Sequence, residues 1–88
     1  MKLYYTEDYS VFKMYAQNRS LNENNVKKMV TSIKQNGLIQ PLIISSDRYV
    51  IDGQHRLAAC MRLGIEVPYV VNYRLTNQAI IEANNTQR

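Results

Sequence analysis

The sequence predicts a small α+β domain in which a mixed β-sheet is accompanied by about three helices. Amphipathic helical patterns alternate along the chain with short β-branched runs. Their order is helix, hairpin, helix, strand and helix, which is typical of an α+β arrangement. The chain has 88 residues, which is enough for one hydrophobic core and too few for two. Residues 1–88 are therefore expected to form a single domain.

The clearest helix is predicted over residues 23–36. Asn22 precedes it and is a good N-cap, because its side-chain oxygen can accept a hydrogen bond from an unpaired backbone N–H. Gly37 then supplies the left-handed stop that commonly ends a helix. Four apolar residues at helical spacing form one buried stripe: Val26, Met29, Val30 and Ile33.

A second helix is predicted from Gln54 to Leu63, directly after a glycine turn and ending at Gly64. Its inward residues are expected to be Leu57, Cys60 and Met61. A short third helix is predicted over residues 79–83. The predicted strands are short β-branched or aromatic runs, and residues 45–48 form the turn of a hairpin. These strands cover residues 2–5, 11–15, 42–44, 49–51 and 69–71.

Composition excludes several classes of protein. One cysteine and one histidine cannot build a disulfide scaffold or the usual zinc sites made of cysteine and histidine. The chain shows no apolar leader and no stretch long enough to span a bilayer. A cytoplasmic protein with no membrane partner is therefore expected. The net charge of +4 is compatible with an anionic partner such as a nucleotide or a nucleic acid.

The segment from Asp52 to Arg56 places a sharp glycine turn between a strand and a helix. The first turn of a helix has unpaired N–H groups and a partial positive charge, and Gly53 allows a positive φ or the close approach of a ligand. Gln54 and His55 can donate hydrogen bonds, and Arg56 can bind phosphate oxygens in a fork. The segment therefore predicts a phosphate site.

A purely structural interpretation stays open at this point. Glycine often occurs in strand-to-helix turns for its geometry alone. Asp52 would then only cap the helix, and the Arg56 side chain would only be solvated. The residues by themselves do not decide between the two interpretations.

The sequence resembles the N-terminal domain of the ParB/sulfiredoxin superfamily over about two thirds of the chain. The sequence DGQHR at 52–56 most resembles that of the short proteins of phages and mobile elements often called ParB-like nuclease domains. The resemblance implies a ParB/sulfiredoxin-like fold. It rests on four stretches in the family's order: NRSL at 18–21, NGLIQPLII at 36–44, YVIDGQHRLAA at 49–59 and LGIEVP at 63–68.

The resemblance implies a nucleotide as the ligand. In ParB proteins the segment matching Gly53 to Arg56 holds the phosphates of CTP, and in sulfiredoxins it holds those of ATP. The expected cofactor is thus a nucleoside triphosphate or diphosphate (CTP, or ATP and ADP) with Mg²⁺. Sulfiredoxins carry their reactive cysteine where this chain has Gln54. An amide cannot replace that nucleophile, so sulfiredoxin reductase chemistry is not expected.

Further site residues are expected around the phosphate segment. Arg19, Gln40, Asn85 and Arg88 match segments that surround the family's nucleotide. Candidate metal ligands are Asn85 and Glu82, and candidate catalytic groups are Asp52 and His55. Asn84 stands where the family commonly has a glutamate, which argues against metal-assisted hydrolysis. The alternative for residues 84–88 is a frayed chain end.

Three classes of function remain open from the sequence. The first is a nucleotide-binding accessory of DNA transactions in a phage or plasmid, partition-like or regulatory. The second is an enzyme, either a ParB-like nuclease, an NTPase or a small-molecule phosphotransferase. The third is a DNA- or protein-interaction domain that binds no nucleotide. DNA and a second copy of the chain are possible partners. Larger relatives continue past the position of Arg88 into a helical DNA-binding region, so truncation is a further expectation.

Overall fold

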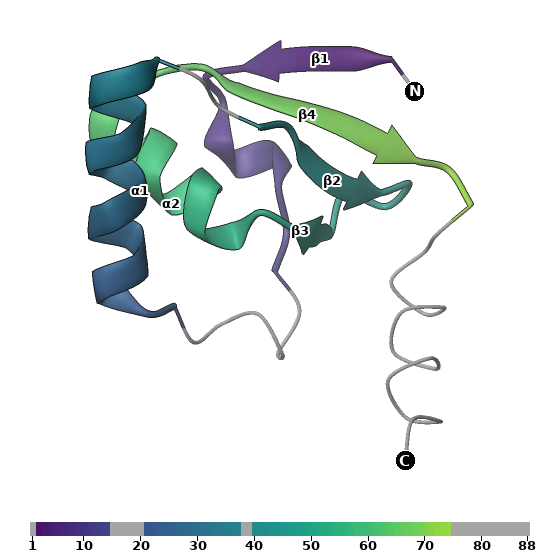
Figure 1. Cartoon of the computed structure of the whole chain (residues 1–88). Helices are drawn as coiled ribbons and strands as arrows, with labels where there is room; N and C mark the ends of the chain where they lie inside the picture. Colours follow the sequence, from purple (N-terminus) through teal and green to yellow (C-terminus); the bar gives the residue numbers. More distant parts are fainter. Residues whose placement is uncertain (1, 15–20, 38–39, 75–88) are drawn as a thin grey trace.

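A computed structural model describes residues 2–14, 21–37 and 40–74 of the chain. Two α-helices, one 3₁₀-helix and four strands lie within these residues (Figure 1). The expected helices at 23–36 and 54–63 are confirmed at both ends. In chain order the elements are β1 Leu3–Thr6, η1 Tyr9–Val11, α1 Glu23–Asn36, β2 Leu42–Ser45, β3 Val50–Asp52, α2 Gln54–Leu63 and β4 Val67–Asn72.

The four strands form one mixed sheet in the order β1-β4-β2-β3. β2 and β3 are the expected antiparallel hairpin, and β1 runs antiparallel to β4. β2 and β4 are parallel neighbours. Parallel strands need a crossover connection, and β3 with α2 supplies it. The crossover places the first turn of α2 beside the start of β2.

The core lies between the sheet and α2. Leu42 and Ile44 of β2 pack with Leu57 and Cys60 of α2 in one buried cluster. α1 packs chiefly against α2, through a stripe in which Val26 and Ile33 are buried. Figure 1 shows α1 and α2 close together beside the sheet. The backbone N–H of Asn22, just before α1, donates to His55 in the first turn of α2 at 3.2 Å, so the two helix N-termini are neighbours.

One expected strand is wrong, and one expected helix falls on residues that the structure does not describe. The strand expected over residues 11–15 does not form in its described part, residues 11–14: η1 occupies Tyr9–Val11, and of these four residues Lys13 alone makes a bridge, with Tyr49. The cause is local, since Asp8 accepts hydrogen bonds from the backbone and hydroxyl of Ser10 at 3.2 and 2.5 Å and so caps a turn. The third helix, predicted over residues 79–83, lies outside the described residues.

The inward face of α2 also differs from the prediction. Leu57 and Cys60 are buried as expected, but Met61 is 51% exposed and Ala59 is fully buried. α2 packs against the sheet on one side and α1 on the other, so its buried surface is wider than one stripe. Met61 faces away from both contacts.

Candidate functional site: the N-terminus of the second helix

The N-terminus of α2 has no side-chain cap. Its N-cap is Gly53, in a left-handed conformation with φ 107° and ψ 21°, and no side chain bonds to the first-turn amides. The Gly53 carbonyl accepts the first helical bond from Leu57 at 2.9 Å. The turn contains no acidic residue. Amides of the first turn thus remain available to an acceptor from outside the helix.

Gly53 is required here by packing as well as by its φ. A Cβ atom at this position would lie 2.5 Å from Cδ2 of Leu42. Leu42 is fully buried in the core, so it has little room to move away. The glycine therefore lets the turn lie directly on β2. This brings the first amides of α2 close to the sheet.

Arg56 is held against the start of β2. Its Nη1 donates to the carbonyl of Pro41 at 3.0 Å, and its Nη2 donates to Asp52 at 3.1 Å. Only 14% of the Arg56 side chain is exposed, against 61% for Asp52. The alternative that Arg56 is simply solvated is therefore wrong. So is the alternative that Asp52 caps α2, because its carboxylate bonds to Arg56.

His55 connects the beginnings of the two helices. Its Nε2 accepts a hydrogen bond from the backbone N–H of Asn22 at 3.2 Å. An imidazole nitrogen that accepts carries no proton, so in this contact His55 is neutral with its proton on Nδ1. The Nδ1–H is then the one donor that the ring offers to a ligand. Asn22 also caps α1 by accepting from the N–H of Asn25 at 3.2 Å.

A groove lies on each side of the α2 N-terminus. The groove on the His55 side has a volume of about 430 Å³, and the groove on the Arg56 side about 350 Å³. The first groove runs along α1 beside His55 of α2, and the second lies over the start of β2. The first groove is lined by Asn25, Lys28, Met29, Ser32 and His55. The second is lined by Gln40, Pro41, Ile43, Asp52, Arg56 and Val70.

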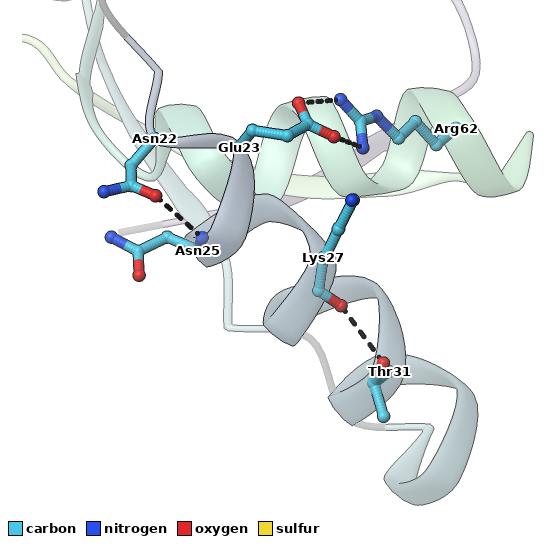
Figure 2. A network of polar contacts seen from close by, with 6 residues as sticks. All are labelled: Asn22, Glu23, Asn25, Lys27, Thr31 and Arg62. Carbon is cyan, nitrogen blue, oxygen red and sulfur yellow. Dashed lines mark hydrogen bonds and ion pairs between the residues drawn. The ribbon is translucent and has the colours of Figure 1, made fainter.

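An ion pair also joins the first turn of α1 to the last turn of α2. Glu23 accepts two hydrogen bonds from the guanidinium of Arg62, both at 2.5 Å (Figure 2). The hydrogen bonds from Arg62 lower the pKa of the Glu23 carboxyl, although desolvation opposes the shift. The pKa of Arg62 is raised by the same bonds. Figure 2 shows that Glu23 follows the Asn22 cap in the first turn of α1 and that Arg62 reaches it from α2.

The other predicted residues fall into two groups. Gln40 lines the Arg56-side groove, and its expected place around a nucleotide stays a prediction. Arg19, Glu82, Asn85 and Arg88 lie outside the described residues. Cys60 is buried and its pKa is raised by burial, which fits the expected core residue and not a reactive thiol.

Sequence reasoning missed the contribution of α1 to this site. Lys28 and Ser32 are one turn apart and lie in the groove beside His55. Their i, i+4 spacing on the polar face of the predicted helix was the available signal. It did not reveal that this face meets the start of α2. No group of three or more metal-ligating side chains occurs among residues 2–14, 21–37 and 40–74.

Comparison with known proteins identifies relatives by sequence. The family model described as the ParB N-terminal domain matches residues 10–85. The probable chromosome-partitioning protein ParB of Rickettsia typhi is 32% identical over 68 residues, 74% of this chain and 24% of that protein. Its counterpart in Rickettsia prowazekii is 34% identical over the same length and shares. The chain thus spans about a quarter of these relatives' length.

Solved structures share the fold. C-terminally truncated ParB from Caulobacter crescentus, complexed with CTP-gamma-S, superposes with a TM-score of 0.71 at 21% identity, covering 100% of this chain and 54% of that one. Sulfiredoxin from Arabidopsis thaliana gives 0.73 at 20% identity, covering 99% and 100%. A Pnob8-like ParB-N domain gives 0.68 at 25%, covering 94% and 35%.

No helix in the described part of the chain is long and apolar enough to cross a membrane. The mixed four-stranded sheet with two α-helices agrees with the fold of the ParB structure. The family model covers most of the chain, including α1, α2 and the strands β2 to β4 of the described residues. This chain belongs to the ParB N-terminal domain family.

Proposed function

We propose that this domain binds a nucleotide whose phosphates lie at the N-terminus of α2. The observation that carries the proposal is the uncapped first turn after Gly53, with His55 and Arg56 on either side of it. Backbone amides then lie between two side chains that can donate, His55 in one groove and Arg56 in the other. The structural relative complexed with CTP-gamma-S supports a nucleotide as the ligand.

The groove between α1 and α2 is the proposed place for the nucleoside. Its volume of about 430 Å³ lies within the range typical of small-molecule sites. Asn25 and Ser32 offer polar groups, Met29 offers an apolar surface and Lys28 a positive charge. His55 lines this groove and lies in the first turn of α2, so a ligand there can reach the helix N-terminus. The nucleotides proposed for this groove are CTP, ATP and ADP.

Phosphate binding requires a local exchange of partners. Arg56 donates to Asp52, whose carboxylate is 61% exposed. A bound phosphate would replace this carboxylate while the bond from Arg56 to Pro41 remains. Charge-assisted bonds to phosphate are strong and can be bidentate. Asp52 thus becomes free to orient the turn or to contact a cation when nucleotide is present.

Mg²⁺ fits this site only as a partner of the nucleotide. Within the described residues the two grooves contain one carboxylate, that of Asp52. Mg²⁺ in proteins is commonly bound by one or two carboxylates together with substrate phosphates and water. Asp52 with the phosphates matches that description. NTPase, nuclease and phosphotransferase activities stay predictions, since one carboxylate does not define a reaction.

The wider role we propose is that of an accessory in DNA transactions. The relatives identified by sequence are named as chromosome-partitioning proteins, and this supports a partition-like role. An origin in a phage or plasmid, a cytoplasmic location and oligomerisation are predictions from the sequence. They are compatible with a domain that belongs to a longer ParB-like protein.

A nucleotide-free interaction domain is the second candidate. It is favoured by the contacts already made by His55 and Arg56, which bond to Asn22, Pro41 and Asp52. These contacts stabilise the turn without any ligand. Under this candidate the same residues are structural, and their replacement lowers stability and leaves no nucleotide affinity to lose.

Calorimetric titration distinguishes the two candidates. CTP, ATP, ADP and GTP are titrated into the full chain with and without Mg²⁺. Micromolar binding that falls about 30-fold in Arg56→Gln is expected, since losing a charged hydrogen bond to phosphate costs about 2 kcal/mol. Lys34→Gln removes the same charge from an exposed position in the last turn of α1 and is the matched control. Binding of none of the four nucleotides, or equal binding by both variants, would contradict the proposal.

A further inference from the structure

The end of the sheet formed by the β2–β3 hairpin carries a second cluster of functional side chains. The register pairs Ser45 at the end of β2 with Asn72 at the end of β4. It also pairs Leu3 of β1 with Val70, which brings Lys2 beside the last residues of β4. Lys13 bridges to Tyr49 in the same hairpin. Four segments distant in sequence therefore meet here.

Positive charge dominates this end. Lys2, Lys13, Arg48 and Arg74 are all exposed. Lys13 lies directly beside the hairpin, since its N–H donates to the carbonyl of Arg48 at 2.8 Å. Among the described acidic residues, Asp47 alone belongs to this end, and its carboxylate accepts a hydrogen bond from the Ser45 hydroxyl.

The other described acids lie elsewhere. Glu7, Asp8 and Glu66 flank the opposite end of the sheet, where β1 ends and β4 begins. Asp52 and Glu23 form ion pairs with Arg56 and Arg62. The four cations of the hairpin end are therefore not neutralised by a matching set of acids in the described chain.

Tyrosine rings lie among these cations. The Lys2 ammonium lies 5.3 Å from the centre of the Tyr4 ring, and the Lys13 ammonium 5.7 Å from that of Tyr49. Tyr73 is 71% exposed and follows β4. A hydrogen bond with Tyr4 raises the pKa of the Tyr73 hydroxyl, while the charges of Arg48 and Lys2 oppose this rise. Tyr73 thus lies within electrostatic reach of both cations.

Arg48 occupies its position at a conformational cost. Its φ is 76°, in the left-handed region that an L-residue other than glycine enters at about 1–2 kcal/mol. Glycine or asparagine would relieve this strain at an exposed turn. An arginine that stays in a strained, exposed turn where glycine would be more stable suggests that its side chain has a function. Here that side chain is one of the four cations.

We propose that this surface binds single-stranded nucleic acid. We call it the hairpin-end patch and define it as Lys2, Tyr4, Lys13, Arg48, Tyr49, Tyr73 and Arg74. The cations would contact successive phosphates, and the exposed face of Tyr73 would stack on an unpaired base. A duplex has no unstacked base to offer this ring, whereas a single strand does. The surface lies away from both grooves at the α2 N-terminus, so the inference does not depend on nucleotide binding there.

The first test is fluorescence anisotropy of the full chain with fluorescein-labelled oligothymidine over a salt series. Each phosphate contact on a single strand contributes a slope of about −0.7 in log K against log salt. Arg48→Gly should reduce the magnitude of the slope by about that amount and weaken binding several-fold at low salt. Its melting temperature should not fall, because glycine relieves the positive φ. Lys34→Gln on α1 is the matched control and should bind as the unaltered chain does.

The second test concerns the tyrosine. Tyr73→Ala should weaken oligothymidine binding about tenfold, because a stacked base is lost. Tyr73→Phe keeps the ring and should bind within about twofold of the unaltered chain. If both variants bind equally well, stacking on this residue is excluded and the proposal fails.

Three further outcomes would overturn the proposal. One is equal or tighter binding of a duplex with the same length. Another is equal binding of polyglutamate, which would show a surface selective only for negative charge. The third is loss of oligothymidine binding in Arg56→Gln but not in Arg48→Gly, which would place the strand at α2. Conversely, Arg48→Gly should bind free nucleotide normally, so the two proposals can fail separately.

Discussion

The two helices of this domain begin in opposite ways. At the start of α1, Asn22 accepts from the N–H of Asn25, and Glu23 adds a negative charge in the first turn. At the start of α2, Gly53 offers no side chain and the first turn has no acid. The N-terminus of α1 is thus satisfied within the protein. That of α2 has both its amides and its partial positive charge left for another group.

The capped start of α1 contributes to stability, whereas the uncapped start of α2 leaves amides that a ligand can bind. A capped N-terminus gains about 1 kcal/mol over an uncapped one. The α2 turn forgoes that gain, and its glycine adds an entropic cost. Packing on Leu42 accounts for the glycine, but not for the absence of a cap or an acid. An external anion is the simplest partner for such a helix end.

Gly53→Ala, at the start of α2, should have the largest effect on the free energy of unfolding. The new methyl group would lie 2.5 Å from Leu42 in a turn with φ 107°. Strain and overpacking together should lower the free energy of unfolding by about 3 kcal/mol. Urea denaturation followed by circular dichroism measures this loss.

The matched control is Gly64→Ala at the other end of α2. Gly64 has a φ of 67°, and a Cβ there would meet no atom within 4 Å. Its replacement should cost about 1 kcal/mol, from the backbone alone. If the two variants are equally destabilised, the contact with Leu42 is not what requires glycine at the α2 turn.

Some of this arrangement could be predicted because its causes are local. The cap at Asn22 and the left-handed glycines that end both helices depend on neighbours within a few residues. Both helices therefore had the expected bounds. The wrong strand over residues 11–15 also has a local cause, a cap at Asp8 that apolar spacing does not reveal.

The contacts of the site could not be read from local patterns. The Asn22–His55 bond joins residues 33 positions apart, and the Arg56–Pro41 bond joins residues 15 apart. The Tyr9 hydroxyl similarly donates to the carbonyl of Ile65 at 2.7 Å, across 56 positions. Such contacts arise only when the sheet and helices are assembled. The sequence therefore predicted the turn from Asp52 to Arg56 before α2 but not the partners of its side chains.

Bound nucleotide should supply the partner that the N-terminus of α2 lacks, and so should raise the melting temperature of the protein. A ligand that binds only the folded state at 100 times its dissociation constant stabilises it by about 2.7 kcal/mol. The expected result is a rise in melting temperature with nucleotide in the unaltered chain and a much smaller rise in Arg56→Gln. Thermal unfolding followed by circular dichroism measures both. An equal rise in the two proteins would show that the anion binds away from α2.

Asn22→Ala should remove the cap of α1 and make its N-terminus resemble that of α2. The loss of the bond to the Asn25 N–H should cost about 1 kcal/mol. The backbone N–H of residue 22, which donates to His55, is kept in this variant. Asn22→Asp retains an accepting oxygen and should be nearly as stable as the unaltered chain. Equal losses in the two variants would mean that the side chain acts through something other than capping.

The smallest expected effect is the dependence on pH of the Glu23–Arg62 pair. Hydrogen bonds from Arg62 hold the pKa of Glu23 below its usual 4.5. A carboxyl with a lowered folded-state pKa stabilises the protein above its unfolded value, and this contribution disappears as the pH falls through the folded value. Glu23→Gln lacks the titrating group. Its stability should therefore decrease less from about pH 5 to about pH 3 than that of the unaltered chain.

The control for this effect is Glu66→Gln, which removes an exposed acid that belongs to neither of the two ion pairs in the described residues, Arg56–Asp52 and Arg62–Glu23. Urea denaturation at each pH, repeated at high salt, gives the comparison. Because the Glu23–Arg62 pair is exposed, salt should reduce the difference between Glu23→Gln and the unaltered chain. If the free energies of unfolding of Glu23→Gln and Glu66→Gln depend on pH in the same way, the Glu23–Arg62 ion pair makes no measurable contribution to stability. The contrast between the two helix ends would then rest on the Asn22 cap and the Gly53 turn alone.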